Sequence, residues 1–287
     1  RPRVIEDRIQ KLNLSLAIGR DFELCDPEQD SRFHDYWNMY HEHLGRQGVS
    51  PEYAKTMVRT SNTVIACLMV KRKEADGLIC GTIGVFHRHL RHVRDILGLA
   101  KNRKSLHSLY MLVVEKLGEP LAPLFFTDTH VAQNPSEDDL EEMTLMATEV
   151  MKMFGITPKV ALLSHSNFGS SDSASAQKMQ RAVARLKQSC AFEVEGEMHP
   201  DTAMDENIRA NFLTHSHLTG AANLMVFPNL DAANICYNMV KMLAAEGIST
   251  GPILMGSAAV AHIMTPAATS RGIINMTAFA SVEASMK

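Results

Sequence analysis

The sequence predicts an α/β protein with mostly parallel sheets, built as two three-layer α/β/α domains. The first observation is a regular alternation of short apolar runs and longer amphipathic segments after residue 134. This pattern is typical of parallel strands joined by right-handed helical crossovers. The second is the length of 287 residues, which suits two domains of about 150 residues each. The third is a globular composition, with 45% hydrophobic and 21% charged residues.

The first half of the chain predicts helices separated by a few short strands. Ser50 and Pro51 mark a helix start, as a cap and a first helical residue. Helices are expected over residues 2–14, 30–44, from 51 onward, 63–72 and 82–99. Strands are expected over residues 22–25, 76–81, 109–114 and 121–127, the last two as a hairpin across 115–120.

The second half alternates more strictly. Ser136, followed by acidic residues, predicts a capped helix that reaches Phe154. Strands are expected over residues 159–163, 192–197, 222–227 and 252–255, and further helices over 174–189, 201–213, 231–245 and 273–284. In the helix from Asp231, one apolar stripe is expected to pack and the opposite side to face solvent. The stripe consists of Ala232, Ile235, Cys236, Met239, Val240 and Leu243, and the polar side of Asn234, Asn238 and Lys241.

A domain boundary is expected near Asn134, after a polar tip and before a capped helix. The first subdomain would comprise residues 1–133, completed by about 262–287, and the second residues 134–261. The chain has no initiator Met and begins in the lead-in to a helix, so we expect a fragment of a longer protein, truncated at its N-terminus.

Composition excludes several classes of function. A net charge of −3, from 29 basic and 32 acidic residues, gives no bulk attraction for nucleic acid or an anionic membrane. Five scattered cysteines without a Cys-x-x-Cys pair favour a reducing cytoplasm over a disulfide framework. No apolar run approaches the ~18 residues of a membrane span, and the start lacks a signal peptide.

The segment 159–171 is the leading ligand-loop candidate. Its apolar first half predicts a buried strand, and the turn that follows supplies Ser164, His165 and Ser166. Ligands of open α/β sheets lie beyond the carboxyl ends of strands, near helix starts that favour anions. The alternative is simple capping of the next helix by Ser170, Asp172 or Ser173.

Three arginines and three histidines gather in residues 87–94. On a helix, Arg88, Arg91 and Arg94 would lie near one another and face a phosphate, or equally form a solvated surface. The histidine spacing does not place three metal ligands on one helical face, and His215 and His217 read as part of a polar loop. We therefore expect no metal site. No nucleotide-binding glycine motif, P-loop or nucleophile elbow is present.

Several segments, in order, resemble phosphate acetyltransferase (phosphotransacetylase). They are Val160–Ser166, Gly196–His199, Ala222–Leu230, Asn234–Tyr237, Gly251–Gly256 and Ile274–Ala278. The resemblance implies the phosphotransacetylase fold, which is isocitrate/isopropylmalate dehydrogenase-like, and a homodimer or higher homo-oligomer. Leu162–Asp172, Ile79–Thr82 and His89–Asp95 are most similar to the C-terminal domain of large hybrid bacterial NADP-dependent malic enzymes. That likeness implies a separate malic enzyme catalytic domain as partner, holding NADP and Mg or Mn outside this chain.

The resemblance also places the catalytic loop. Active members carry a Ser, an Arg and, slightly later, an Asp, taken as stabiliser, phosphate binder and base for the CoA thiol. With Gly251–Gly256 and Ile273–Asn275 as ungapped anchors, these positions hold Thr265, Pro266 and Gly272. A gapped alignment would instead use Ser270 and Arg271. Without a cation and a base the chain is expected not to transfer acetyl groups.

The acyl-CoA pocket is nevertheless expected to persist. Carried over from the family, its candidate contacts are Arg91, Ser164, His165, Ser166, Asn223, Asn229, Thr265 and Asn275. The resulting hypothesis is a catalytically inactive regulatory domain that binds acetyl-CoA as an allosteric inhibitor of malic enzyme. The alternatives are an active phosphate acetyltransferase and a purely structural oligomerisation module.

Overall fold

The computed structural model describes residues 2–116, 119–120, 123–244 and 248–286. Contacts divide the chain into two compact units, one of residues 1–75 with 95–97 and one of residues 76–94 with 98–287. The expected boundary near 134 therefore does not coincide with the division between these units.

The first unit is helical. Its helices are α1 (Pro2–Lys11), α2 (Phe33–Leu44), α3 (Pro51–Thr60) and α4 (Asn62–Lys71), with a short 3₁₀ turn at Gly45–Gln47. Ser50 caps α3 as expected, because its hydroxyl accepts a hydrogen bond from the Tyr53 backbone N–H at 3.2 Å. The expected strand 22–25 is not formed. Phe22 makes only an isolated bridge with Ile18, which closes a turn and not a ladder.

The second unit contains a six-stranded sheet in the order β7-β6-β8-β5-β2-β9. Its strands are β2 (His107–Val113), β5 (Leu124–Thr127), β6 (Lys159–Leu163), β7 (Glu193–Met198), β8 (Leu224–Val226) and β9 (Ile248–Met255). Neighbours β7, β6, β8 and β5 run parallel, whereas β2 is antiparallel to both β5 and β9. The prediction of a mostly parallel α/β fold is confirmed.

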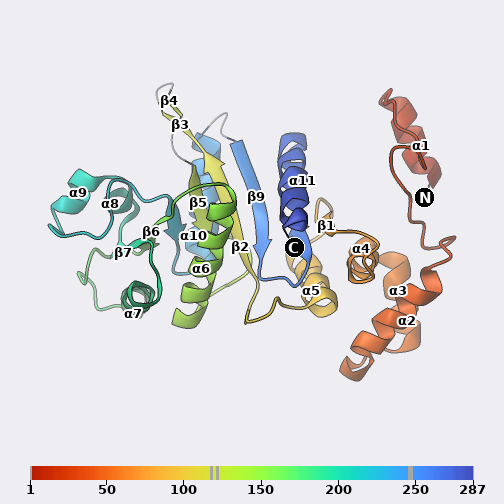
Figure 1. Cartoon of the computed structure of the whole chain (residues 1–287), viewed down its shortest axis with the longest axis horizontal. Coiled ribbons are helices and arrows are strands. Elements are labelled where there is room, and N and C mark those ends of the chain that lie inside the picture. The colour runs from red at the N-terminus through yellow and green to blue at the C-terminus, as the bar shows by residue number, and fades with distance from the viewer. Residues whose placement is uncertain (1, 117–118, 121–122, 245–247, 287) are drawn as a thin grey trace. The chain divides into compact units, whose positions relative to one another are not determined.

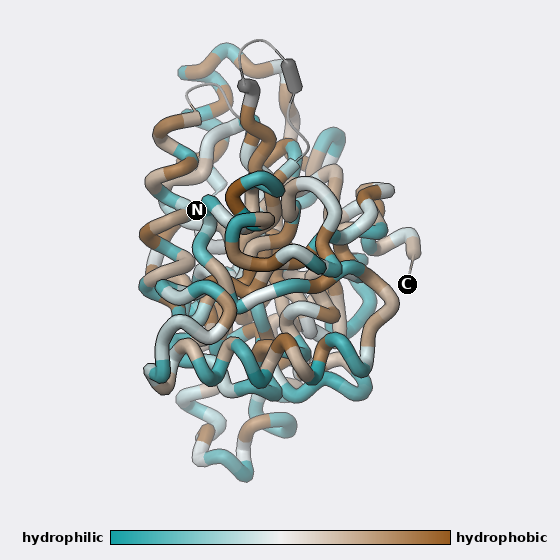
Figure 2. Tube along the Cα trace, turned by 90° about the vertical axis from the view of Figure 1, so that its left-hand side faces the viewer, coloured by the Kyte–Doolittle hydropathy of each residue, from teal (hydrophilic) through white to brown (hydrophobic). Residues whose placement is uncertain are grey.

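Helices cover both faces of this sheet. Helices α6 (Glu137–Met153), α7 (Ala174–Ser189) and α11 (Ser270–Ser285) contribute to one apolar cluster, whereas α8 (Pro200–Met204) and α10 (Leu230–Leu243) contribute to the other. In Figure 1, α6 lies in front of the sheet and α10 behind it. Along the helices the trace alternates between hydrophilic and hydrophobic stretches, as one-sided burial requires (Figure 2). The second unit thus has three layers.

A separate two-stranded sheet pairs β1 (Gly77–Cys80) with β10 (Val260–Ile263) in parallel. Strand β10 was not expected from the sequence. Helix α5 (Phe86–Leu97) follows β1, and α11 follows β10. The turns after β1 and β10 lie together, because the Met264 N–H donates to the Cys80 carbonyl at 2.7 Å.

Strands β2 and β5 form the expected antiparallel pair, but they belong to the large sheet. The sequence had placed them in the first subdomain, apart from the strands after residue 134. Pairing of Phe125 with Leu224 joins the two groups into one sheet. Glu115–Lys116 (β3) and Glu119–Pro120 (β4) extend the hairpin, while residues 117–118 and 121–122 of the expected hairpin lie outside the described residues.

Helix α10 packs by only part of the stripe that the sequence predicted, since Ala232, Cys236 and Val240 lie half-buried against the core. Its buried residues are Ala233 and Tyr237. Ile235 and Met239, from the expected buried stripe, are 64% and 58% exposed. The tyrosine takes the inner face because its ring stacks on Tyr110 of β2 with centroids 4.0 Å apart. An apolar strip of α10 is left on the surface.

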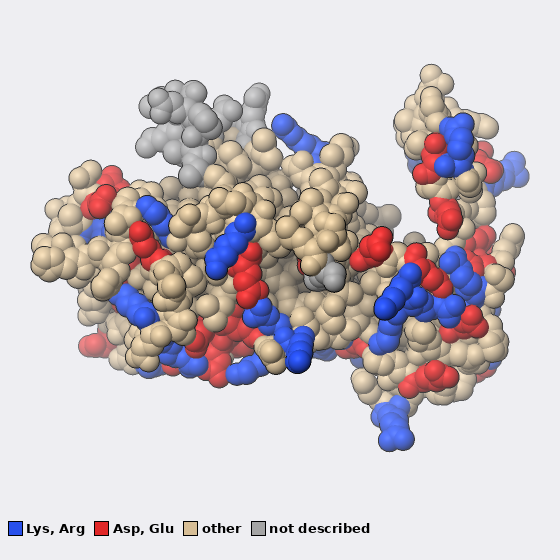
Figure 3. All heavy atoms as spheres, viewed as in Figure 1, with Lys and Arg blue, Asp and Glu red and all other residues tan. Residues whose placement is uncertain are grey.

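Charges of both signs intersperse on the face shown in Figure 3, in keeping with the nearly balanced composition. Among the described residues, no helix combines the length and the apolar character that a membrane crossing demands.

Candidate functional site

The carboxyl ends of β5, β6, β7 and β8 meet at one edge of the large sheet, because these strands are parallel neighbours. Each is followed by a turn with polar side chains. Asn167 joins two of these turns, since its Oδ1 accepts from the His199 backbone N–H at 2.8 Å. The edge is therefore a polar rim above an apolar sheet, the position where open α/β folds bind ligands.

Ser164 is the first residue beyond β6, and its backbone N–H donates to the Met198 carbonyl at 2.9 Å. Its side chain is only 9% exposed, and its hydroxyl has no hydrogen-bond partner among the described residues. A buried polar atom without a partner is costly unless a ligand or water satisfies it. Ser164 is thus the strongest binding candidate in this turn.

The other two candidates in the turn differ from Ser164. Ser166 is buried and donates to Glu197 Oε1 at 2.7 Å, so its hydroxyl holds the turn together. His165 is exposed, and its Nε2 lies 3.3 Å from the Ser171 hydroxyl. Capping of α7 belongs to Ser173, whose hydroxyl accepts from the Ala176 N–H. The capping hydroxyl and the unpartnered hydroxyl therefore belong to different residues of one loop.

The two asparagine candidates on either side of β8 lie at opposite edges. Asn229 follows β8 on the rim and caps α10 by accepting from the Ala232 N–H at 2.9 Å. Asn223 precedes β8, where its amide bonds to the backbone of Thr157 and Lys159 at 2.9 and 2.7 Å. Its side chain thus ties together the starts of β6 and β8 and does not join the other candidates.

Thr265 follows β10 and is half-buried. Its side chain lies close enough to the Tyr110 hydroxyl to lower the pKa of that phenol slightly, against the larger effect of burial. The Tyr110 ring lies 5.6 Å from the His130 ring, and His130 lies 4.9 Å from Phe86, centroid to centroid. The expected position of the family serine therefore adjoins Tyr110, one member of an aromatic cluster from β2, α5 and the turn after β5.

Burial sets the protonation of this cluster. Burial raises the pKa of Tyr110, which keeps the phenol neutral. Burial also lowers the pKa of His130 to about 4, helped by His87 and Lys241 and opposed by Asp128. At neutral pH the imidazole of His130 is therefore uncharged, and it offers hydrogen bonds without a positive charge.

Asp128 anchors the turn that carries His130. It is buried and accepts from His107 Nδ1 at 3.0 Å and from the backbone N–H groups of Val131 and Ala132 at 3.1 and 3.0 Å. Burial alone would raise its pKa, but the hydrogen bonds from His107 and Ser108 outweigh burial and lower it. Its carboxylate is fully occupied as a structural anion.

A hydrogen-bonded chain continues from this anchor to the aromatic cluster. Ser108 Oγ lies 3.3 Å from Thr129 Oγ1, which lies 3.0 Å from His130 Nδ1. Sequence reasoning marked Thr127–His130 as a polar tip without assigning a role to His130. The position of His130 just after a strand was the one signal in the sequence for a role at the site. Its contact with Tyr110 is a tertiary contact, which the sequence does not reveal.

The remaining positions carried over from the family, apart from Arg91, lie in the first part of α11 or just before it. Pro266 is exposed in the turn before the helix. Gly272 lies in its first turn, where its N–H donates to the Thr269 hydroxyl at 3.1 Å. Ser270 and Arg271 are exposed at the helix start, Asn275 is half-buried in α11, and Arg91 is exposed on α5. In the ungapped register, the loop has a hydroxyl but neither a cation nor a carboxylate.

Residues 215–217 form a loop, as expected. The His217 N–H donates to Glu195 Oε2 at 2.9 Å, and Arg209 donates to the carbonyls of Leu218 and Gly220. Within the described ranges, no group of three or more His, Cys, Asp or Glu side chains is arranged to hold a metal ion.

Comparison with known proteins shows that the chain is similar to part of several malic enzymes. The chain is 46% identical over 286 residues to an NAD-dependent malic enzyme of Rhizobium meliloti, and 43% identical over 285 residues to an NADP-dependent malic enzyme of Escherichia coli. Each alignment covers 99% of this chain but only 36% and 37% of the relative. The chain thus spans little more than a third of the malic enzymes that it matches.

A solved phosphotransacetylase from Streptococcus pyogenes superposes with a TM-score of 0.86 at 23% identity, over 100% of this chain and 85% of that one. The two chains share a fold, which confirms the expected fold class. The family model described as phosphate acetyl/butaryl transferase matches residues 3–281. The match covers nearly the whole chain, which therefore belongs to the phosphate acetyl/butaryl transferase family.

Proposed function

We propose that this chain is a regulatory segment of a malic enzyme that binds acetyl-CoA and does not transfer its acetyl group. The observation that carries the proposal is the loop after β10. It keeps a hydroxyl at Thr265 close to Tyr110, but has Pro266 and Gly272 where active relatives are expected to carry a cation and a carboxylate. A CoA thiol, with a pKa near 8.5, then has no base positioned to accept its proton.

Binding would use the rim and the aromatic cluster. The unpartnered Ser164 hydroxyl and the neutral imidazole of His130 suit an uncharged thioester. Arg91 would meet phosphate oxygens of the CoA moiety. We place NADP and Mg or Mn in the catalytic part of the parent protein, outside this chain.

Acetyl-CoA would act as an inhibitor by preferring one arrangement of the assembly. A ligand shifts such an equilibrium only by its difference in affinity for the two states, typically about 1–3 kcal/mol. We further propose a cytoplasmic homodimer. The exposed strip of α10, with Ile235, Met239, Met242 and Leu243 between 58% and 79% exposed, offers an apolar contact surface for a second copy.

The test is calorimetric titration of the protein with acetyl-CoA, with CoA as the reference ligand and an acetyl phosphate turnover assay on the same sample. We expect binding without turnover. Turnover would mean that the gapped alignment through Ser270 and Arg271 is correct. Absence of both binding and turnover would favour a purely structural module.

Substitutions locate the site. Ser164→Ala should weaken acetyl-CoA binding about two- to tenfold, the range for one hydrogen bond, and Arg91→Ala should weaken binding of phosphorylated ligands. The matched controls are Ser285→Ala in the last turn of α11 and Arg46→Ala, exposed in the 3₁₀ turn Gly45–Gln47. Equal affinities for Ser164→Ala and its control would remove Ser164 from the site.

A further inference from the structure

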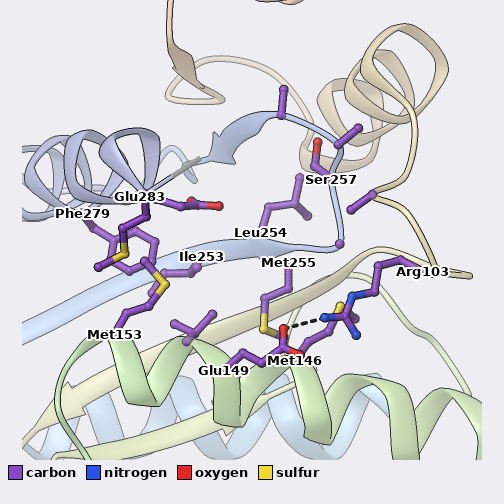
Figure 4. Close-up of a pocket in the computed structure, with 16 residues that line it drawn as sticks. Arg103, Met146, Glu149, Met153, Ile253, Leu254, Met255, Ser257, Phe279 and Glu283 are labelled. Carbon is purple, nitrogen blue, oxygen red and sulfur yellow. Dashed lines mark hydrogen bonds and ion pairs between the residues drawn. The ribbon is translucent and has the colours of Figure 1, made fainter.

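A second pocket lies away from the rim, between α6, α11 and the end of β9 (Figure 4). Its volume is about 300 Å³, within the range of small-molecule sites. Most of its lining is apolar. The methionines Met146, Met153, Met255 and Met286 contribute to it, together with Phe279. The lining of the pocket reaches Ala259, just before β10, whereas Thr265 lies beyond the other end of that strand.

The charged groups of the pocket already have partners. Arg103 pairs with Glu149 at one side, as Figure 4 shows. Glu283 Oε2 lies 3.1 Å from His262 Nε2, close enough for an electrostatic contact but not aligned as a hydrogen bond. His262 Nδ1 accepts from the Leu254 N–H at 3.2 Å, so Nε2 is the ring nitrogen on the side of Glu283. Arg103, Glu149 and Glu283 thus each contact a neighbouring side chain, and the other residues of the pocket lining are uncharged.

Ser257 is different. It is 7% exposed, and its hydroxyl has no hydrogen-bond partner among the described residues. It lines the pocket at the turn after β9. A buried hydroxyl of this kind costs free energy unless an occupant supplies a donor or an acceptor.

We propose that this pocket binds a small, uncharged, mostly apolar molecule with a single polar group, such as an alcohol, ketone or ester, which pairs with the Ser257 hydroxyl. An apolar cavity of about 150 Å³ accepts benzene, so this one has room for roughly twice that bulk. Methionine side chains adapt to ligands of different shape, because they are unbranched and polarisable. The proposal is independent of acetyl-CoA binding.

The first measurement locates the occupant. In protein labelled with ¹³C at the methionine methyl groups, benzyl alcohol is the probe. We expect saturable shifts of the methyl signals of Met146, Met153, Met255 and Met286. Met204 and Met239, which do not line the pocket, should not move. Shifts confined to other methionines, or no shift, would overturn the proposal.

The second measurement tests the hydroxyl. Toluene, which lacks the alcohol, is titrated beside benzyl alcohol into wild type and Ser257→Ala. The affinity for benzyl alcohol relative to that for toluene should fall by about two- to tenfold in Ser257→Ala, because only the alcohol loses a hydrogen bond. An unchanged ratio would exclude Ser257 as the polar partner.

A third variant tests the cavity itself. Val150→Trp, on the α6 wall of the pocket, should abolish binding of both probes by filling the space. Val282→Trp is the matched control, because Val282 is 48% exposed on α11 and does not line the pocket. Loss of binding in the control, or retention in Val150→Trp, would contradict the assigned location.

Discussion

His130 shows how a single side chain acquires a defined state from its surroundings. Its ring lies between Phe86 and Tyr110, and its Nδ1 contacts the Thr129 hydroxyl. Burial lowers its pKa to about 4 from 6.5. Between pH 6.5 and pH 4, His130 is therefore mostly protonated in the unfolded chain and mostly neutral in the folded protein.

This difference predicts a pH dependence of stability. As the pH falls from 6.5 towards 4, the unfolded chain gains a proton at His130 and the folded protein does not. Protonation therefore stabilises the unfolded state, and the free energy of unfolding decreases as the pH decreases. Replacing His130 by Asn should reduce the stability lost between pH 7 and pH 5 by about 1–2 kcal/mol. Urea denaturation at the two pH values measures it.

His165→Asn provides the control, because His165 is exposed. The control should retain the pH dependence of wild type. If His130→Asn also retained it, the imidazole would not be held neutral by the fold.

At the same scale, the sequence separates some candidate site residues better than others. The polar turn after a buried strand was enough to point to Ser164. It was not enough to distinguish Ser164 from Ser166, because the difference arises from Glu197 on a neighbouring strand. Asn223 and Asn229 were carried over together, and only the direction of β8 separates them.

At the scale of elements, the period of α10 was predicted correctly, but only Ala232, Cys236 and Val240 of the expected stripe pack against the core. Apolar residues at helical spacing indicate a stripe, but the sequence does not say whether the core or a partner covers it. Tyr237 and Ala233 occupy the inner face because the neighbouring strand presents Tyr110. Similarly, the helix expected over 201–213 is two helices, α8 and α9 (Glu206–Ala210). Asp205 separates them by capping α9.

The exposed strip of α10 leads to a prediction on assembly. Met239→Glu would place a charge without a partner in the proposed dimer contact, at a cost of about 3–5 kcal/mol. The dimer dissociation constant should rise about a hundredfold or more, while the helical content stays the same. Sedimentation equilibrium with circular dichroism measures both.

Asn238→Glu adds the same charge at another exposed position of α10 and should leave the dissociation constant near that of wild type. A monomeric wild type would contradict the proposed dimer. A dimer whose dissociation constant is unchanged by Met239→Glu would show that the contact does not involve this strip of α10.

At the scale of the whole molecule, the alternating pattern was sufficient for the fold class, and most helices and strands lie where it indicated. The alternating pattern did not predict two features of the fold. Strand β10 is four residues long within a run of small residues, too short to stand out by periodicity. The grouping of strands into sheets depends on pairings such as Phe125 with Leu224, which local sequence does not encode.

The β1–β10 pair has a consequence for the order of folding. Gly77 pairs with Val260, so this small sheet closes a loop of about 180 residues. Closing so long a loop is slow unless the intervening chain is already compact. We expect the large sheet to form first and to bring the two strands within reach.

Pulsed hydrogen exchange during refolding measures this order. The Met264 amide, bonded to Cys80 in the small sheet, should gain protection after the Phe227 amide, bonded to Thr127 in the large one. Simultaneous protection would contradict the sequence of events. Because Thr265 directly follows this late pairing, the candidate ligand site would be the last part of the second unit to mature in a newly made chain.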